Sequence, residues 1–182
     1  MLLDSSKLTL IFIDIQEKLL PKIFNNKEIM KNCQKIIEVS NYLKIPTIMS
    51  EQYPKGLGNT VKPINDLLIK GDFEKFEKSS FSCFGSAEFS DYFFKQKKTQ
   101  VILCGIEAHI CVLQTAYDLI FQGIEVYLID EAIGSRKNLD KSLALERMQK
   151  WGINVINFEM FAFELIKDSN HNHFKEISSL VK

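Results

Sequence analysis

Short apolar runs alternate with longer segments of helical periodicity along most of the chain. The clearest runs are LTLIFID (8–14), TQVILCG (99–105) and IEVYLID (124–130), each of a length typical of a buried strand. Between them, apolar residues recur every three or four positions, as on the buried face of a helix. Strands joined by helices of this length form parallel sheets covered on both faces. The alternation predicts an α/β fold, a three-layer α/β/α arrangement around a mainly parallel, doubly wound sheet.

Weaker signals bring the expected sheet to five or six strands. Further strands are expected at IPTIMS (45–50), DFEKFEK (72–78) and INVIN (153–157), and helices near residues 29–43, 88–97, 109–122 and 138–152. The turn-rich segment 51–63 is expected to be a long loop, and residues from about 168 to be a polar tail or a loosely docked helix. No domain boundary interrupts the pattern, so we expect a single domain spanning residues 1–182.

The charge balance argues against binding to polyanions. The chain has 23 Lys and Arg residues and 23 Asp and Glu residues, so no net positive charge is available to hold a nucleic acid or an acidic membrane. No apolar run reaches the roughly 18 residues of a membrane span, and the first residues lack the basic segment of a signal peptide. We therefore expect a cytoplasmic protein that binds a small molecule, but neither nucleic acid nor membrane.

The four cysteines lack the spacing of disulfide scaffolds and of zinc sites, so free thiols are expected. Cys33 lies on the apolar stripe of its helix and Cys104 ends a buried strand, and both are expected to pack in the core. Cys83, in the loop SSFSCFGS (79–86), is a candidate for lining a pocket, but no neighbour in the sequence activates it. The fourth, Cys111, is the candidate nucleophile.

Cys111 falls in the first turn of the helix expected at 109–122. On a regular helix it lies off the apolar stripe formed by Leu113, Ala116, Tyr117 and Ile120. The helix dipole and the unpaired N–H groups of a first turn favour a thiolate, and these N–H groups are also suited to an oxyanion hole. Free cysteines are, however, more often inert core residues. The position of Cys111 therefore fits either role.

Asp14 closes the first expected strand, so its carboxylate lies at the carboxyl end of the sheet, where α/β proteins bind their ligands near a topological switch point. The alternative is that Asp14 caps the following turn with its side chain. A catalytic role becomes the stronger interpretation only if other reactive groups lie nearby.

A cysteine nucleophile needs a partner that accepts its proton. His109 lies two residues before Cys111, and such positions do not face each other on a helix, so a dyad would require an irregular turn. In the alternative, Asp14 accepts the proton and Lys78, at the end of the FEKFEK strand, keeps carboxylate and thiolate charged. Lys78 is otherwise an ordinary charge on an edge strand.

Metal and cofactor sites find no support in the sequence. His171 and His173 could chelate a metal weakly, but they belong to a polar segment near the end of the chain. The chain lacks an H-E-x-x-H motif and any cysteine and histidine set with zinc spacing, and GLGNT (56–60) lacks the G-K-[ST] of a phosphate loop. We predict neither a metal nor a cofactor.

Four segments in a fixed order carry a family resemblance: FIDIQ (12–16), EQYPKGLGNTV (51–61), FEKSSFSCF (76–84) and CGIEAHICVLQTA (104–116). Together they resemble the isochorismatase-like cysteine hydrolases over roughly residues 7 to 160, and most of all the branch of isochorismatase domain-containing proteins. The order of the four motifs is far more specific than any one of them alone.

The resemblance implies a catalytic triad. Motif by motif, the family's aspartate, lysine and cysteine fall on Asp14, Lys78 and Cys111. Cys111 would attack a carbonyl or carbamoyl carbon, Asp14 would take the thiol proton and later activate water, and Lys78 would stabilise both charges. The family also has a non-proline cis peptide, expected here between Glu107 and Ala108, which would direct the N–H groups of Ala108 and Cys111 to the oxyanion.

The resemblance also limits the choice of substrate. Nicotinamidase members carry an Asp-x-His metal motif after the second strand, where this chain has SEQYP (50–54), so neither a metal nor nicotinamide is inferred. Many members have a hydroxyl residue at the position of Ala108. The residues expected to contact the substrate are those that flank the motifs, Gln16, Tyr53, Phe81 and Glu107.

The resulting hypothesis is a hydrolase that acts on a small amide, carbamoyl or related substrate through a covalent cysteine intermediate. The family commonly forms dimers or larger assemblies, so a homo-oligomer is expected. Two alternatives remain open. One is a redox or regulatory thiol protein in which Cys83 resolves an oxidised Cys111, and the other is a noncatalytic small-molecule-binding module. A nucleic-acid enzyme is the least expected, because of the charge balance.

Overall fold

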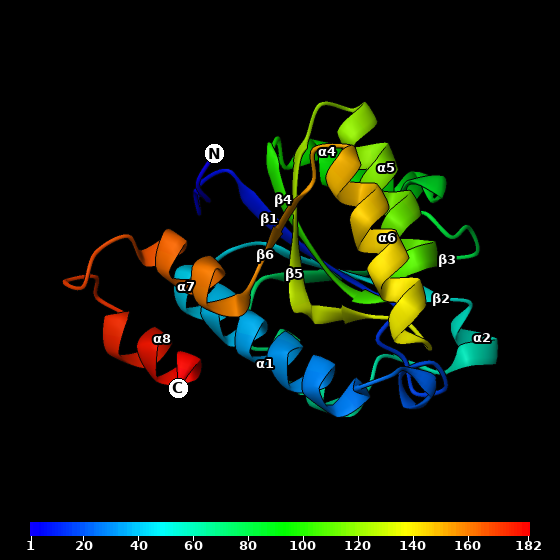
Figure 1. The fold of residues 1–182 in the computed structure, drawn as a ribbon, viewed down its shortest axis with the longest axis horizontal. Helices are drawn as coiled ribbons and strands as arrows, with labels where there is room; N and C mark the ends of the chain where they lie inside the picture. Colours follow the sequence, from blue (N-terminus) through cyan, green and yellow to red (C-terminus); the bar gives the residue numbers. More distant parts are fainter.

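A fully parallel sheet forms the centre of the computed structural model, which describes all 182 residues (Figure 1). Neighbouring strands are parallel throughout, in the order β3-β2-β1-β4-β5-β6. The predicted α/β fold with a doubly wound parallel sheet is confirmed. The six strands are β1 (Leu8–Ile13), β2 (Thr47–Gln52), β3 (Phe73–Lys78), β4 (Gln100–Ile106), β5 (Glu125–Gly134) and β6 (Asn154–Ile156).

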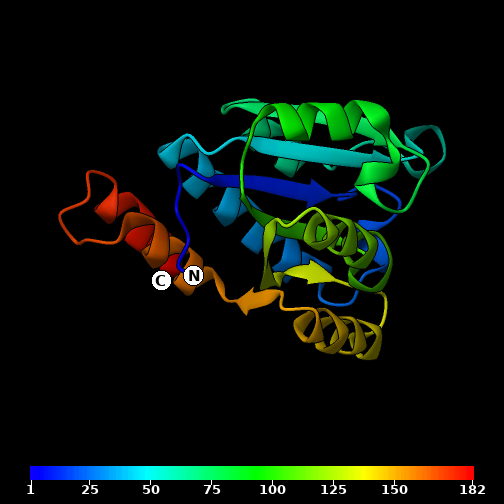
Figure 2. The same ribbon diagram turned by 90° about the horizontal axis from the view of Figure 1, so that it is seen from above.

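Helices cover both faces of the sheet, as Figures 1 and 2 show. Alternate residues of β1 enter two separate apolar cores: Leu10 and Phe12 face one, Ile11 and Ile13 the other. The first core is closed by α1 (Asn26–Leu43), α3 (Lys62–Leu68), α7 (Phe158–Ile166) and α8 (Phe174–Val181). The second is closed by α4 (Ala87–Lys95), α5 (Leu113–Phe121) and α6 (Asn138–Lys150).

The sheet order reverses at β1. From β1 the chain moves outward to β2 and β3, then returns to place β4 on the other side of β1. Gly105 lets β4 pass close to β1 at this point: its φ is +112°, and a Cβ there would lie 2.1 Å from the Ile13 carbonyl oxygen. The carboxyl ends of β1 and β4 therefore border the topological switch point, where α/β sheets bind ligands.

Several helices differ from the prediction. The segment expected to be one long loop contains α2 (Pro54–Leu57) and leads directly into α3, and the apolar segment after β6 is helix α7. The polar tail is helical at α8, and Ile177 within it is fully buried. The C-terminal segment is thus docked on the first core rather than loosely attached.

The helix after β4 begins irregularly. Residues Ala108–Val112 form a π-helical turn, η3, and the regular helix α5 starts only at Leu113. The stripe predicted from regular spacing is correct only in part. Ala116 is buried, and Leu113 and Ile120 pack against the core, but Tyr117 is exposed. Cys111 and Thr115, which were expected on the other side, face the core. A π-helical turn contains more residues than an α-helical turn, so side chains on either side of it point in other directions than regular helical spacing predicts.

Candidate active site

Three reactive side chains meet at the carboxyl edge of the sheet. Asp14 directly follows β1, Lys78 ends β3, and Cys111 lies in η3 after β4; all three are buried. The Lys78 Nζ is 2.8 Å from Asp14 Oδ2. Asp14 adopts a left-handed φ of 54°, a conformation that is uncommon outside glycine and frequent at functional sites. Its carboxylate accepts no backbone N–H, so it is not a helix cap.

Strand β2 lies between β1 and β3 and holds both charged side chains. Ser50 Oγ donates a hydrogen bond to Asp14 Oδ1 at 2.7 Å, and Gln52 Oε1 accepts one from Lys78 Nζ at 2.7 Å. Ser50 and Gln52 are two positions apart, so their side chains leave the strand on the same face. The sequence analysis missed both residues; the signal available was a pair of polar residues at the carboxyl end of a strand.

Lys78 is also surrounded by main-chain acceptors. Its Nζ donates to the carbonyl oxygens of Phe81 at 3.1 Å and Ser80 at 3.3 Å. Burial alone would lower the pKa of Lys78, but the charge of Asp14 and the smaller effects of the thiols Cys83 and Cys111 raise it above its usual value. Lys78 is therefore a permanent cation at neutral pH.

Cys111 is a protonated thiol in the resting site. Its pKa is raised to about 12, first by burial and then by the charge of Asp14, while Lys78 acts in the opposite direction and a hydrogen bond to Asp14 adds to the increase. The expectation that the helix start favours a thiolate is thus wrong, because burial and the neighbouring carboxylate outweigh the helix dipole. Ionisation of Cys111 has to be coupled to transfer of its proton.

This thiol state predicts an unusual pH dependence of alkylation. We expect iodoacetamide to label Cys111 slowly at neutral pH, with a rate that still rises at about pH 10, since only the thiolate reacts. Asp14→Asn should lower the pKa of Cys111 and speed its labelling, because the carboxylate charge that raises this pKa is removed. Lys78→Met should raise the pKa of Cys111 and slow its labelling. Mass spectrometry of native protein labelled across the pH range measures this, and a wild-type plateau below about pH 8.5 would contradict the assignment.

The start of η3 supplies the main-chain groups expected to bind an oxyanion. Ala108 and Cys111 both lie within this turn, as the prediction requires. The non-proline cis peptide joins Ile106 and Glu107, one bond earlier than predicted. The N–H of Glu107 donates no hydrogen bond within the chain, so it is a further free donor beside Ala108.

The four predicted substrate contacts lie in different environments. Gln16 is buried, and its amide bonds to the main chain of Gln52 and Gly58, which ties down the loop after β2 and leaves no free group for a substrate. Tyr53 and Phe81 are exposed at the rim. Glu107 accepts hydrogen bonds from Arg136 N and Nε at 3.2 and 3.0 Å, which places an exposed guanidinium beside η3.

No histidine forms a dyad with Cys111. His109 Nδ1 is 2.9 Å from Ser135 Oγ at the end of β5, so the irregular turn does not create a Cys-His dyad. His171 and His173 lie close to each other near α8, far along the chain from the triad. No group of three or more His, Cys, Asp or Glu side chains is arranged to hold a metal ion.

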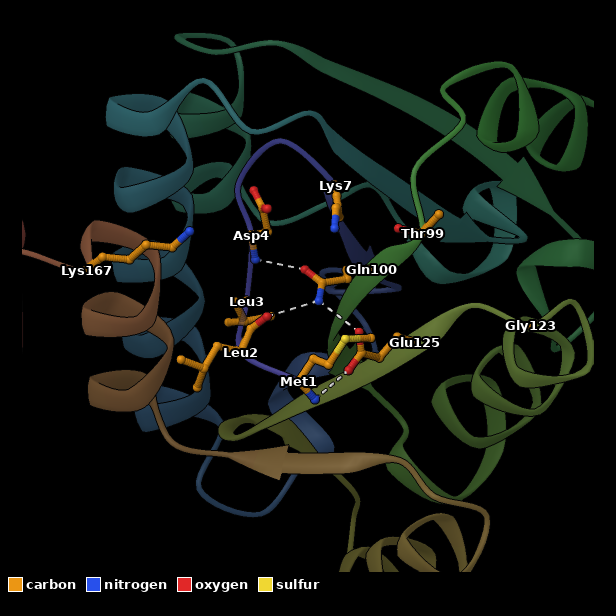
Figure 3. A pocket seen from close by; sticks show the side chains of 10 residues that line it. All are labelled: Met1, Leu2, Leu3, Asp4, Lys7, Thr99, Gln100, Gly123, Glu125 and Lys167. Atoms are coloured by element: carbon orange, nitrogen blue, oxygen red, sulfur yellow. Dashed lines mark hydrogen bonds and ion pairs between the residues drawn. The ribbon is translucent and has the colours of Figure 1, made fainter.

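Cavities lie at both ends of the strands, and two of them bear on the location of the site. One of about 300 Å³ borders Lys78 and is lined by residues of two loops, among them Tyr53 and Ser79. Figure 3 shows the other, about 340 Å³, at the amino ends of the strands. There the Met1 amine, 3.0 Å from Glu125 Oε1, and the Gln100 amide both donate to the Glu125 carboxylate, and no cysteine lines the cavity. The candidate site therefore lies at the first edge.

Comparison with known proteins identifies the family of the chain. Residues 9–160 match the isochorismatase domain. The chain is 37% identical over 172 residues to isochorismatase domain-containing protein 2 of Danio rerio, covering 94% of this chain and 85% of that protein. The chain belongs to the isochorismatase family. The predicted family resemblance is confirmed, and membership of this family supports a hydrolase activity.

Solved structures of the isochorismatase fold match closely. A Caenorhabditis elegans structure described as MAR1 ribonuclease is 35% identical, with a TM-score of 0.93 over 100% of this chain and 92% of that chain. Escherichia coli YcaC, described as an octameric hydrolase of unknown specificity, is 20% identical with a TM-score of 0.87 over 99% and 94%. At that identity the likeness concerns the fold alone. None of the helices here is both long and apolar enough to span a membrane.

Proposed function

We propose that the chain is a cysteine hydrolase that cleaves a C–N bond of a small amide or carbamoyl compound. One observation carries the proposal: a buried thiol, carboxylate and ammonium group meet at the switch point of the sheet, each supplied by a different strand end. Burying a charged side chain costs folding free energy unless the charge is paired, and clusters of buried ionisable groups are frequent at functional sites. This cluster is therefore a candidate site on physical grounds. Family membership supports the hydrolase class.

The first half of the reaction forms a covalent intermediate. Asp14 takes the proton of the Cys111 thiol as the sulfur attacks the substrate carbonyl carbon, since the thiol is protonated at rest. The oxygen, now negative, accepts hydrogen bonds from N–H groups at the start of η3. Collapse breaks the C–N bond, and the departing amine takes the proton from Asp14, which leaves a thioester on Cys111.

The second half of the reaction releases the product. Asp14 accepts a proton from water, the resulting hydroxide attacks the thioester carbon, and the Cys111 sulfur leaves and takes that proton back. Lys78 stays protonated throughout, because its pKa is raised, and its charge stabilises whichever of Asp14 and Cys111 is negative. The overall reaction consumes one water and yields a carboxylic acid and an amine.

A substrate screen tests the proposal. We expect release of ammonia or amine from one or more members of a panel of aliphatic amides, aromatic amides and N-carbamoyl compounds. Intact-mass spectrometry of the acid-quenched enzyme should show an acyl adduct on the Cys111 peptide. Turnover without any adduct would argue for direct attack by water, and no turnover across the panel would favour the noncatalytic binding module.

A second candidate activity comes from the similar C. elegans structure, whose description names a ribonuclease. RNA cleavage would need a surface that attracts phosphates, and this chain has equal numbers of acidic and basic residues. We expect no cleavage of single-stranded or double-stranded RNA at about 0.1 M salt. Cleavage that disappears in Cys111→Ser would assign RNA to this site instead of an amide.

We also propose that the chain forms a homo-oligomer, in line with the octamer described for YcaC. Exposed aromatic side chains such as Tyr53, Phe81 and Phe121 offer apolar surface to a second copy. Light scattering after size exclusion is expected to give a multiple of the 21.0 kDa chain mass. Independence from metals and cofactors and a cytoplasmic location remain predictions from the sequence.

A further inference from the structure

A second thiol lies beside the proposed nucleophile. Cys83 begins the short helical turn η2 (Cys83–Gly85), and its N–H donates to Thr115 Oγ1 at 3.0 Å. Thr115 lies one helical turn after Cys111, and both face the core. Cys83 and Cys111 also belong to the same apolar cluster under α5. The loop after β3 therefore places the Cys83 thiol against the helix face that carries Cys111.

The two thiols share the same charged neighbours. Burial and the Asp14 charge raise the pKa of Cys83 to about 11, while Lys78 and hydrogen bonds from Thr115 and Ser50 act in the opposite direction. Cys83 in turn contributes to the raised pKa of Cys111. The charges of Asp14 and Lys78 thus act on both thiols, in agreement with the contact through Thr115.

Access to solvent distinguishes the two thiols. Cys111 is 6% exposed, whereas Cys83 has no exposed surface. Of the two, Cys111 is therefore the cysteine that a small oxidant from solvent can reach. A partly accessible thiol next to a fully buried one is suited to a pair in which the first is oxidised and the second resolves it.

We propose that Cys83 and Cys111 form a reversible disulfide when a hydroperoxide enters the site. The Cys111 sulfur, which gives its proton to Asp14, attacks the peroxide oxygen; the O–O bond breaks, the thiol is oxidised to sulfenic acid, and the alcohol or water leaves with the proton. The Cys83 thiol then attacks the Cys111 sulfur. The S–O bond breaks, the oxygen leaves as water with the Cys83 proton, and the disulfide remains.

The other two cysteines provide an internal control. Cys33 and Cys104 are both buried in the core on the opposite face of the sheet. Burial raises the pKa of both thiols above the usual range, with a smaller contribution from Cys33 to Cys104, and no carboxylate or ammonium group is among the causes. Cys33 Sγ donates to the Ala132 carbonyl oxygen at 3.5 Å. Neither thiol has a carboxylate to accept its proton in the first step, so this pair should stay reduced.

The experiment uses the full chain and hydrogen peroxide. Protein treated with peroxide is unfolded and labelled with N-ethylmaleimide, and the intact mass counts the free thiols. We expect labels on two of the four cysteines, a Cys83–Cys111 peptide in a nonreducing digest, and full labelling after dithiothreitol. Four labels on the treated protein, or a disulfide between other cysteines, would overturn the proposal.

Two variants test the order of the steps. Cys83→Ser is nearly isosteric and should remove the disulfide, so that Cys111 instead gains oxygen and is not fully recovered by dithiothreitol. Cys104→Ala should still form the Cys83–Cys111 bond. Persistence of a Cys111 disulfide in Cys83→Ser would overturn the assignment. The readout requires no substrate, so its result is independent of the proposed hydrolase activity, and the wild-type peptide map stands even if a variant fails to fold.

Discussion

Replacing Cys111 by serine is expected to lower turnover of any amide substrate by roughly 10³-fold or more while the fold is retained. The serine hydroxyl fits the space of the thiol, but in the proposed mechanism Asp14 accepts a thiol proton, and an alkoxide is far harder to generate than a thiolate. The initial rate of amine release measures the first effect. Thermal unfolding measures the second, with a midpoint expected within about 2 °C of wild type.

A thiol outside the site provides the matched control for this prediction. Cys104 is fully buried on β4 but faces the opposite core. Cys104→Ala should keep turnover near the wild-type value and lower stability by about 1 kcal/mol, because it leaves a small cavity. If Cys111→Ser turns over substrate as fast as wild type, Cys111 is not the nucleophile.

Breaking the Asp14–Lys78 pair is expected to cost about 3–5 kcal/mol of folding stability, because either single change leaves a buried charge without its partner. Both side chains are only 1% exposed, and the two charged atoms are 2.8 Å apart. Asp14→Asn and Lys78→Met should each show this loss in urea unfolding. The double variant should recover most of the stability, since no buried charge remains, yet stay inactive.

A second ion pair, between β2 and β3, provides the comparison. Lys75 Nζ is 3.3 Å from Glu51 Oε1, but the lysine side chain is 39% exposed. Lys75→Met should cost less than about 1 kcal/mol, because Lys75 is partly solvated and Glu51 Oε1 keeps its hydrogen bonds from the Thr60 N–H and hydroxyl, both at 2.7 Å. A double Asp14 and Lys78 variant no more stable than either single variant would show that the pair is not the source of the effect.

The fold was predictable because its strongest signals are local. The strands β1 and β4 are almost uninterrupted apolar runs, and β5 contains the shorter run VYLI. Such runs are typical of buried parallel strands. Helix α7 was missed because FEMFAFELI is apolar on most sides and lacks a clear polar face. Its start is nevertheless marked by Asn157, whose Oδ1 accepts the N–H of Met160 at 2.8 Å.

The site was predictable only in part. Asp14 follows β1, Lys78 ends β3 and Cys111 lies in the turn after β4, so their shared edge follows from the fold. The contributions of Ser50 and Gln52 depend on β2 lying between β1 and β3, and strand order is not a local property of the chain. The burial of Cys111 depends on the π-helical turn, which regular helical spacing does not anticipate.

The residues of the candidate site are distributed over strand ends and loops, and this distribution has an evolutionary consequence. Asp14, Lys78 and the side chains of β2 that hold them belong to the rigid sheet edge, whereas the exposed rim residues Tyr53 and Phe81 lie on connecting segments. Loop residues tolerate replacement far better than buried strand residues. Descendants of such a chain can therefore change the rim, and with it the compounds that bind there, while the buried Asp14–Lys78 pair is kept.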